Sequence, residues 1–184
     1  MEVLFLPLGI FILVIVVIVL FNRLTNYKKK VDNSWRDLRS VFQKRIDLLK
    51  DLLEMVQLST VTGKEISTKI IEIQKETVNF KRMKVEQFVQ LNHSLNNTLE
   101  KFFSNEEYKS ELQINTKYQE LYKAFIQSKG DLENAGKKYN LNVQNFNSIL
   151  PKFPTSMMAS MAGYHAREMF DAGLNDHVSK TVTL

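Results

Sequence analysis

The 184-residue chain contains no cysteine, and this absence removes several kinds of site at once. Without cysteine the protein has no disulfides, no thiolate metal ligands and no cysteine nucleophile. Many proteins outside the cytoplasm also lack cysteine, so the absence does not identify the compartment. The composition therefore excludes cysteine chemistry and leaves the location open.

Residues that interrupt helices are also scarce, with six glycines and three prolines in the whole chain. Hydrophobic residues make up 44% and charged residues 24%, which is the composition of a folded domain and not of a disordered segment. Outside a membrane segment, the chain has the length of one globular core. Long helices are therefore possible over most of the sequence.

Motifs that carry catalysis or cofactor binding are missing as well. The sequence has no glycine-rich phosphate loop, no H-E-x-x-H and no G-x-S-x-G. Di-metal sites in helical bundles need Glu-x-x-His pairs on facing helices, and His93, His165 and His177 belong to none. His165 has an acid at helical spacing, Glu168, but no second cluster completes a site, which favours a surface pair over a metal site. We therefore predict no enzymatic activity, no cofactor and no bound metal.

The amino end carries the one long hydrophobic run. The 19 residues from Val3 to Phe21 include no charged side chain, with Pro7 and Gly9 as local irregularities. As a helix they extend about 28 Å, close to the hydrocarbon thickness of a bilayer. A cleaved signal peptide would need a basic start and an A-x-A-like cleavage site, whereas this chain has Glu2 at its start and no such site after the run. We predict an uncleaved transmembrane anchor at residues 1–22.

The net charge of +5 is concentrated beside this anchor. From Asn22 to Lys50 there are nine Lys and Arg residues against three Asp, while residues 51–184 hold 16 of each sign. The first four cations after the apolar run are Arg23, Lys28, Lys29 and Lys30. Their position predicts a short extracellular amino end and a cytoplasmic carboxyl-terminal domain. It also favours contact with anionic lipids over nucleic acid, for which cations are usually spread over a folded face with aromatic residues between them.

Apolar residues after the anchor recur at helical spacing in four stretches, and no stretch shows sustained alternation of period two. The first stripe is Val31, Trp35, Leu38, Phe42, Arg45, Leu49, Leu52 and Val56, widened by Leu48 and Leu53. The second is Ile66, Ile70, Ile73, Thr77, Phe80, Phe88, Leu91, Leu95, Leu99 and Phe102, with a slip of register around Lys84 and Gln87. The third is Leu112, Tyr118, Leu121, Phe125, Leu132, Ala135, Tyr139, Val143, Phe146 and Leu150. The fourth, from Thr155 to Phe170, carries Met157, Met161, Tyr164, Met169 and Phe170.

Capping patterns divide these stretches. Thr62 with Glu65 and Ser104 with Glu107 each have the spacing of a capping box, and Pro151 and Pro154 close the third stretch. We predict an all-α fold: an N-terminal transmembrane helix followed by an antiparallel bundle of three long helices plus a short C-terminal helix. The bundle domain is predicted at residues 23–171, and residues 172–184, which lack periodicity, are predicted to be a disordered tail.

Arg45 stands out because it occupies the first stripe between Phe42 and Leu49. A buried guanidinium needs a carboxylate or several carbonyls to offset its desolvation, so burial implies a partner acid. Alternatively, the side chain reaches past its neighbours to water. Both interpretations stay open.

Methionines are concentrated near the carboxyl end, at Met157, Met158 and Met161. Methionine fills irregular gaps in cores, and it also forms adaptable binding surfaces. On a short covering helix, we predict that these residues fill the core.

Two groups of residues resemble the LemA family. The first runs Tyr139-Asn140-x-x-Val143-x-x-Phe146-Asn147, followed by Phe153-Pro154, Ala159, Gly163-Tyr164, Arg167-Glu168 and Phe170. The second is Trp35 followed by Arg45-x-Asp47-Leu48-Leu49 and Leu52, similar to the family's R-x-D-L-[IL]-P-N-L motif. The resemblance implies a bacterial membrane protein with a long-helix bundle, a tiny extracellular amino end and no assigned enzymatic activity.

The chain departs from this family pattern at two places. Lys50 and Asp51 stand where the family usually has Pro-Asn, so we expect the first helix to continue straight. Gly136 stands where an arginine is common, which removes one expected partner from a polar network.

The predicted function is that of a membrane-anchored scaffold or adaptor that engages another protein or a second copy of the chain. Tyr139 and Phe146 share a helix face and are expected in the core, while Asn140 and Asn147 share a face rotated by about 100°. The asparagines either form a binding ridge or satisfy buried backbone groups. The alternative function is an anionic-lipid-responsive sensor or organiser acting through the basic stretch from Arg23 to Lys50.

Overall fold

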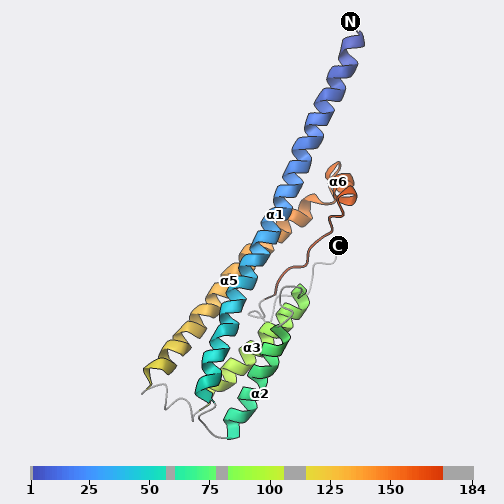
Figure 1. Cartoon of the computed structure of the whole chain (residues 1–184). Coiled ribbons are helices and arrows are strands. Elements are labelled where there is room, and N and C mark those ends of the chain that lie inside the picture. The colour runs from blue at the N-terminus through green and yellow to red at the C-terminus, as the bar shows by residue number, and fades with distance from the viewer. Residues whose placement is uncertain (1, 57–60, 78–82, 106–114, 172–184) are drawn as a thin grey trace. The chain divides into compact units, whose positions relative to one another are not determined.

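The computed structural model describes residues 2–56, 61–77, 83–105 and 115–171. Within these residues it has no strand, and its helices are α1 (Glu2–Val56), α2 (Val61–Glu76), α3 (Val85–Ser104), α5 (Thr116–Ile149) and α6 (Thr155–Met161) (Figure 1). The predicted all-α fold is confirmed. The predicted tail at 172–184 lies outside the described residues.

The chain divides into two compact units, and both α1 and α5 contribute to each of them. The first unit comprises Met1–Arg36 and Lys138–Met169, and so contains the start of α1, the end of α5 and α6. The second comprises Asp37–Lys137 and the chain from Phe170, and so contains α2 and α3 as well. The predicted boundaries of anchor and bundle domain stay predictions.

Helix α1 joins the apolar run to the first bundle helix without interruption. Side chains from Ile10 to Val19 are 41–63% exposed, whereas Leu24 is fully buried. The helix is long and apolar enough to cross a membrane. It also continues through Lys50 and Asp51, as expected from the absence of proline there.

The second predicted stripe is divided between two helices, α2 and α3, which pack against each other. Helix α2 begins one residue before the predicted N-cap Thr62, whose side chain lies outside the described residues. Lys84 precedes α3 in an extended conformation, and its backbone N–H donates to Oε1 of Gln87 at 3.1 Å. This bond satisfies a backbone donor at the helix start. The slip of register in the sequence thus marks a helix boundary.

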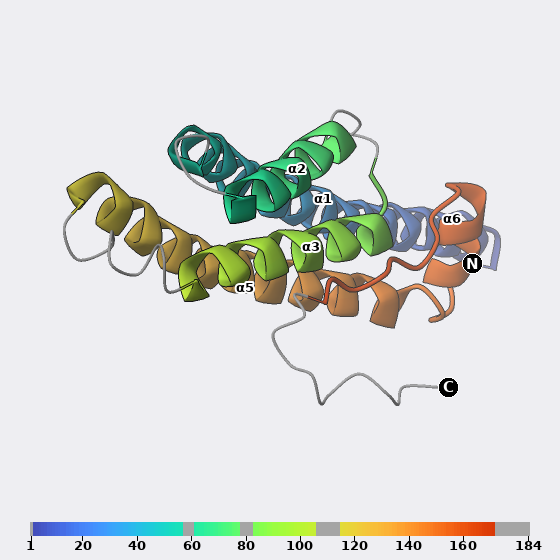
Figure 2. The ribbon, with the colours of Figure 1, turned by 90° about the horizontal axis from the view of Figure 1, so that it is seen from below.

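Helices α2 and α3 of the second unit lie side by side (Figure 2). Aromatic side chains link other pairs of helices in this unit. Phe42 of α1 lies 4.4 Å from Phe88 of α3, measured between ring centroids. Phe102 at the end of α3 lies 5.4 Å from Tyr118 of α5. Aliphatic residues complete this core: Leu38, Ile46, Leu49, Leu52, Ile66, Ile70, Ile73, Leu91, Leu95, Leu99, Leu121 and Leu132 are buried. Each fully buried side chain of this kind contributes roughly 1.5–3 kcal/mol.

The second predicted cap pairs Ser104 with Glu107, and Glu107 lies outside the described residues. Ser104 is the last residue of α3, and its hydroxyl donates to the carbonyl of Lys101 at 3.3 Å. Asn115 caps α5, because its Oδ1 accepts the backbone N–H groups of Lys117 at 3.0 Å and Tyr118 at 3.3 Å. Asparagine is one of the residues preferred at this position.

The last predicted helix, 155–170, is wrong in length, since α6 ends at Met161. Gly163 has φ +66°, which only glycine adopts readily, and its N–H donates to the carbonyl of Ser160 at 3.2 Å. The N–H of Tyr164 donates to the carbonyl of Ala159 at 2.8 Å. These two bonds form a Schellman motif, which terminates the helix. No further helix follows within the described residues up to 171.

Candidate functional site

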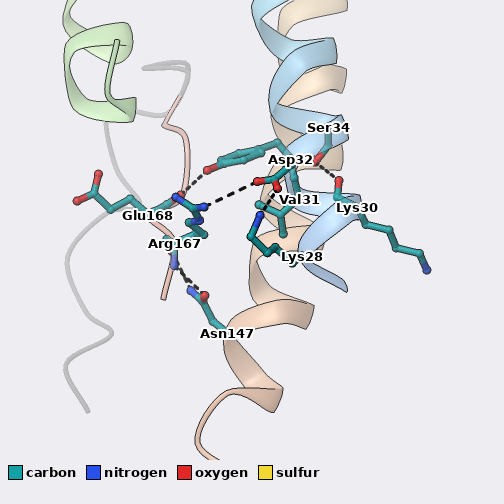
Figure 3. A network of polar contacts seen from close by, with 9 residues as sticks. Lys28, Lys30, Val31, Asp32, Ser34, Asn147, Arg167 and Glu168 are labelled. Carbon is teal, nitrogen blue, oxygen red and sulfur yellow. Dashed lines mark hydrogen bonds and ion pairs between the residues drawn. The ribbon is translucent and has the colours of Figure 1, made fainter. Parts of the chain in front are cut away.

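The segment 163–169, here called the C-terminal strap, is held to α5 by side-chain hydrogen bonds to its backbone. Asn147 donates from Nδ2 to the carbonyl of Arg167 at 2.8 Å and accepts the N–H of Arg167 on Oδ1 at 2.9 Å (Figure 3). The hydroxyl of Tyr139 donates to the carbonyl of Glu168 at 2.9 Å. Because the strap forms neither helix nor sheet, these side chains supply the partners that its backbone would otherwise lack. Asn147 therefore bonds to the strap, although both bonds are exposed and the backbone groups that they satisfy are not buried. Asn140 is half-buried on the same helix.

Charged residues connect the strap to α1. Nη2 of Arg167 lies 3.8 Å from Oδ1 of Asp32, and Oδ2 of Asp32 lies 2.6 Å from Nζ of Lys28 (Figure 3). The same Nζ lies 5.5 Å from the ring centroid of Tyr164. The ion pairs are about one-third to one-half exposed, so each contributes under about 1 kcal/mol. Together they fix the strap beside the first turns after the apolar run.

Tyr139 is the buried member of this network, with 3% of its surface exposed. Burial, assisted by the nearby carboxylates of Glu168 and Asp32 and opposed by Arg167, raises the pKa of Tyr139 to about 12. The hydroxyl therefore stays protonated and can donate at any physiological pH.

Trp35 packs against this tyrosine, with 5.2 Å between the ring centroids of Trp35 and Tyr139. The sequence predicts Trp35 on the buried stripe of the first helix, and this prediction is wrong in part. Trp35 is half-buried, and the neighbouring Ser34 is buried. The hydroxyl of Ser34 donates to the carbonyls of Lys30 at 2.8 Å and Val31 at 3.0 Å, so it needs no other partner (Figure 3).

Arg45 lies in the core of the second unit, with 1% of its surface exposed. Nη1 donates to Oδ1 of Asn92 at 2.8 Å, Nη2 donates to Oδ1 of Asn96 at 2.7 Å, and the guanidinium carbon lies 5.5 Å from the ring centroid of Phe125. Burial lowers the pKa of Arg45 to about 10, so the group is charged at neutral pH. The interpretation that the side chain reaches water is wrong. Among the described residues, the guanidinium donates to two amides and not to the acid that burial implied. Two amide oxygens spaced one helical turn apart on α3 take the place of a carboxylate.

The rest of the motif around Arg45 lies at the surface. Asp47 is exposed, accepts a hydrogen bond from Gln43 at 3.3 Å and pairs with Lys50 at 3.2 Å. Leu48 is half-buried. The structure therefore does not bring Asp47 into the polar core around Arg45.

Three of the four predicted lipid-facing cations are exposed, namely Arg23, Lys29 and Lys30. Arg23 lies one helical turn before Tyr27 and Lys30 one turn after it. Their charged groups lie 5.8 and 5.7 Å from the ring centroid of Tyr27. Lys28 is instead half-buried against the strap. A shallow groove on α1 is lined by Val19, Asn22, Arg23, Asn26, Tyr27 and Lys30.

The corner between α5 and α6 exposes large apolar side chains. Phe146 is buried, but Phe153 is 80% exposed, and Pro154 is half-buried at the start of α6, after a cis peptide bond. Met157 is 59% and Met161 89% exposed, so the predicted core filling by these methionines is wrong. Thr155 and Ala159 form the buried face of α6. Met157 and Met161, each two positions further along the helix, point to the opposite side.

Among the residues that the structure describes, no group of three or more acidic or histidine side chains is arranged to hold a metal ion. His165 and Glu168, the pair noted in the sequence, are both exposed. What the described arrangement does offer is a strap fixed to two helices, three exposed cations and an exposed apolar corner.

A comparison with known protein families covers the strap and the apolar corner but not the three exposed cations. A family model described as LemA family matches residues 34–183, which is most of the chain. The matched range contains Arg45, Tyr139, Asn147 and the whole strap. No curated protein matches the chain.

Proposed function

The chain belongs to the LemA family, and from this premise we propose that it is a membrane-anchored helical scaffold. The observation that carries the proposal is the exposure of the first part of α1. Ten consecutive apolar residues, Ile10–Val19, are each more than two-fifths exposed on a helix that then enters a packed core at Leu24. Water would oppose so large an uncovered apolar surface, whereas hydrocarbon would cover it.

The continuity of α1 gives this anchor a mechanical role. Because no linker separates the apolar run from the buried position of Leu24, the bundle begins within about one helical turn of the bilayer surface. The remaining helix, from Asn22 to Val56, extends about 50 Å further. A helix of this kind holds the first unit close to the bilayer, which suits a protein that positions others.

Exposed apolar side chains on α5 provide a surface for a partner. Tyr122 and Ile126 lie one helical turn apart in the second unit and are 38% and 50% exposed. Aromatic and aliphatic residues of this kind form the centres of protein interfaces. We propose that this pair, rather than Asn147, contacts the partner or a second copy, since the amide of Asn147 is occupied by the strap.

The absence of cysteine makes the proposal easy to test with single engineered thiols. Gln144 is exposed on α5. If Arg23, Lys29 and Lys30 hold the bundle in the cytoplasm, Gln144→Cys should resist a membrane-impermeant maleimide in intact cells and react after lysis. Labelling in intact cells would overturn the orientation, and release of the protein from membranes by alkaline carbonate would overturn the anchor itself.

A second candidate function is that of a sensor or organiser of anionic lipid. The observation that favours it is the arrangement of Arg23 and Lys30 around Tyr27, which presents two cations and an aromatic ring just beyond the apolar run. Such residues are typical of the headgroup region. Changing Arg23, Lys29 and Lys30 to Gln should then abolish any enrichment of phosphatidylglycerol around the reconstituted protein. Lys28→Gln is a control, because Lys28 is engaged by Asp32.

A further inference from the structure

We propose that the corner formed by residues 152–161 is a second membrane contact, inserted into the boundary between lipid headgroups and acyl chains beside the anchor. The inference rests on the proposed function, in which α1 spans a bilayer. Its starting point is the exposure of Phe153, Met157 and Met161 within nine residues, at 80%, 59% and 89%. A cluster of large apolar side chains on the surface marks an interaction site more often than chance exposure.

The register of the two helices in the first unit places this corner at the right height. Trp35 of α1 contacts Tyr139 of α5. Seven residues earlier on α1 is Lys28, and seven residues later on α5 is Phe146. Both contact the same ring, that of Tyr164, at 5.5 and 6.4 Å.

A further step of seven residues in each direction leads from Lys28 to Phe21 and from Phe146 to Phe153. Phe21 is the last residue of the apolar run. Phe153 lies just beyond the end of α5, so it reaches approximately the level of Phe21 along the axis of α1. Figures 1 and 2 show α6 beyond the carboxyl end of α5, toward the amino end of α1. The exposed corner therefore lies at the level at which the hydrocarbon would end.

The composition of the corner suits a lipid interface. Lys152 is exposed next to Phe153, so a cation and an aromatic ring stand together. Met157 and Met161 share the face of α6 that points away from Thr155 and Ala159, which are buried. Aromatic and flexible apolar side chains that enter the acyl boundary, with lysine at the phosphates, are typical of interfacial segments.

This contact would limit the orientation of the bundle. A single membrane-spanning helix tilts freely over tens of degrees unless flanking residues or neighbours fix it. A second contact beside the anchor defines both the tilt and the rotation of the first unit. The bilayer is favoured over a protein as the occupant because the corner continues the surface that the anchor already places in lipid.

The test uses the full chain reconstituted in vesicles of phosphatidylcholine and phosphatidylglycerol. Single cysteines at Met157 and Met161 carry a nitroxide, and collision with oxygen is compared with collision with a water-soluble nickel chelate. Val17→Cys reports whether the anchor is in the bilayer. Leu141→Cys is the matched control, because Leu141 is an apolar residue of α5 in the same unit, 58% exposed, and about 18 Å further from the boundary than Phe153.

We expect the ratio of oxygen to nickel collisions at Met157 and Met161 to exceed that at Leu141 several-fold and to approach the ratio at Val17. Ratios equal to that at Leu141, with Val17 in lipid, would overturn the second contact and leave the anchor intact. Water access at Val17 would instead overturn the proposed function. Protection at Met157 that disappears when the protein is diluted in lipid would identify a second copy as the occupant, which also contradicts the proposal.

A variant provides an independent check. Phe153→Ser, Met157→Gln and Met161→Gln alter exposed side chains and leave the buried face of α6 unchanged. A nitroxide at Lys152→Cys should lose its oxygen preference in this triple variant and keep it in Leu141→Gln. An unchanged ratio at position 152 in the triple variant would show that the apolar side chains do not hold the corner in the membrane.

Discussion

Two glycines of α5 should respond oppositely to the same substitution. An added Cβ at Gly136 would lie 2.8 and 3.0 Å from Cδ1 and Cε1 of Phe170, whereas an added Cβ at Gly130 would meet nothing within 4 Å. Phe170 is 3% exposed and packs edge-on against Phe88, with 5.4 Å between ring centroids. The ring has little room to move away.

The expected magnitudes follow from this geometry. Replacing a helical glycine with alanine ordinarily stabilises a protein by about 0.5–1 kcal/mol, because the unfolded chain loses conformational freedom. Gly130→Ala should show this gain. At Gly136 the ring of Phe170 must shift by roughly 0.5–1 Å to restore normal contact, and overpacking of this kind costs about 1–3 kcal/mol. Gly136→Ala should therefore destabilise the protein by roughly 0.5–2 kcal/mol.

Urea unfolding of the full chain in detergent, followed by circular dichroism, measures both variants against the wild type. Phe170→Ala supplies the background for a double-mutant cycle, because Gly136→Ala should regain its stabilising sign once the ring is gone. If Gly136→Ala stabilised the wild type as much as Gly130→Ala, Phe170 would not pack on α5 as described.

Two further predictions concern polar side chains and can be measured in the same unfolding assay. Arg45→Met alone removes the guanidinium donors from the amide oxygens of Asn92 and Asn96 and should cost about 1–3 kcal/mol. Adding Asn92→Leu and Asn96→Leu removes those acceptors as well, so the triple variant should be less destabilised than the single one. A triple variant as unstable as Arg45→Met would contradict this. Asn147→Ala should cost about 1–3 kcal/mol, because it removes two hydrogen bonds to the strap backbone. The exposed Asn145→Ala should cost under about 0.5 kcal/mol, and equal losses at the two positions would argue against the role of Asn147.

Helical periodicity predicted the elements whose packing is local or repetitive. The stripe from Val31 to Leu52 and the one from Tyr118 to Phe146 both lie in long helices. In an amphipathic helix the apolar residues themselves show which face is buried. The stripe through Phe80 and Phe88 gave one helix where there are two. The apolar pattern continues across the boundary between the two helices and therefore does not reveal it. The hydrogen bond between the backbone of Lys84 and the side chain of Gln87 indicates the start of α3 more clearly.

The polar site was harder to predict because its contacts are distant in sequence. Arg45 bonds to residues 47 and 51 positions away, and Asn147 to a backbone 20 positions away. Periodicity alone leaves open whether Arg45 is buried or reaches water, and it does not identify Asn92 and Asn96, which flank the apolar stripe of α3, as the partners. Gly136 was interpreted as a missing arginine, whereas the structure uses the absence of a side chain to admit Phe170.

Tyr139 provides the pH-dependent prediction. Its folded-state pKa of about 12 exceeds the ordinary value of 10.0, since burial opposes ionisation. A raised pKa contributes stability that is complete below pH 10 and is lost as the pH rises toward 12. The rise in pKa from 10.0 to about 12 corresponds to about 2–3 kcal/mol in the free energy of unfolding.

Tyr139→Phe removes both this titration and the hydrogen bond to the carbonyl of Glu168, which is worth about 0.5–1.5 kcal/mol. The wild type should therefore be more stable than the variant at pH 8, and the difference should shrink above pH 10 and reverse near pH 12. Trp35, the one tryptophan of the chain, contacts Tyr139 and reports unfolding of the first unit by fluorescence. Other lysine, arginine and tyrosine groups titrate in both proteins and cancel in the comparison. A difference that stayed constant from pH 8 to pH 12 would mean that the hydroxyl of Tyr139 ionises without opposing the fold, and the strap would then not depend on a buried, protonated donor.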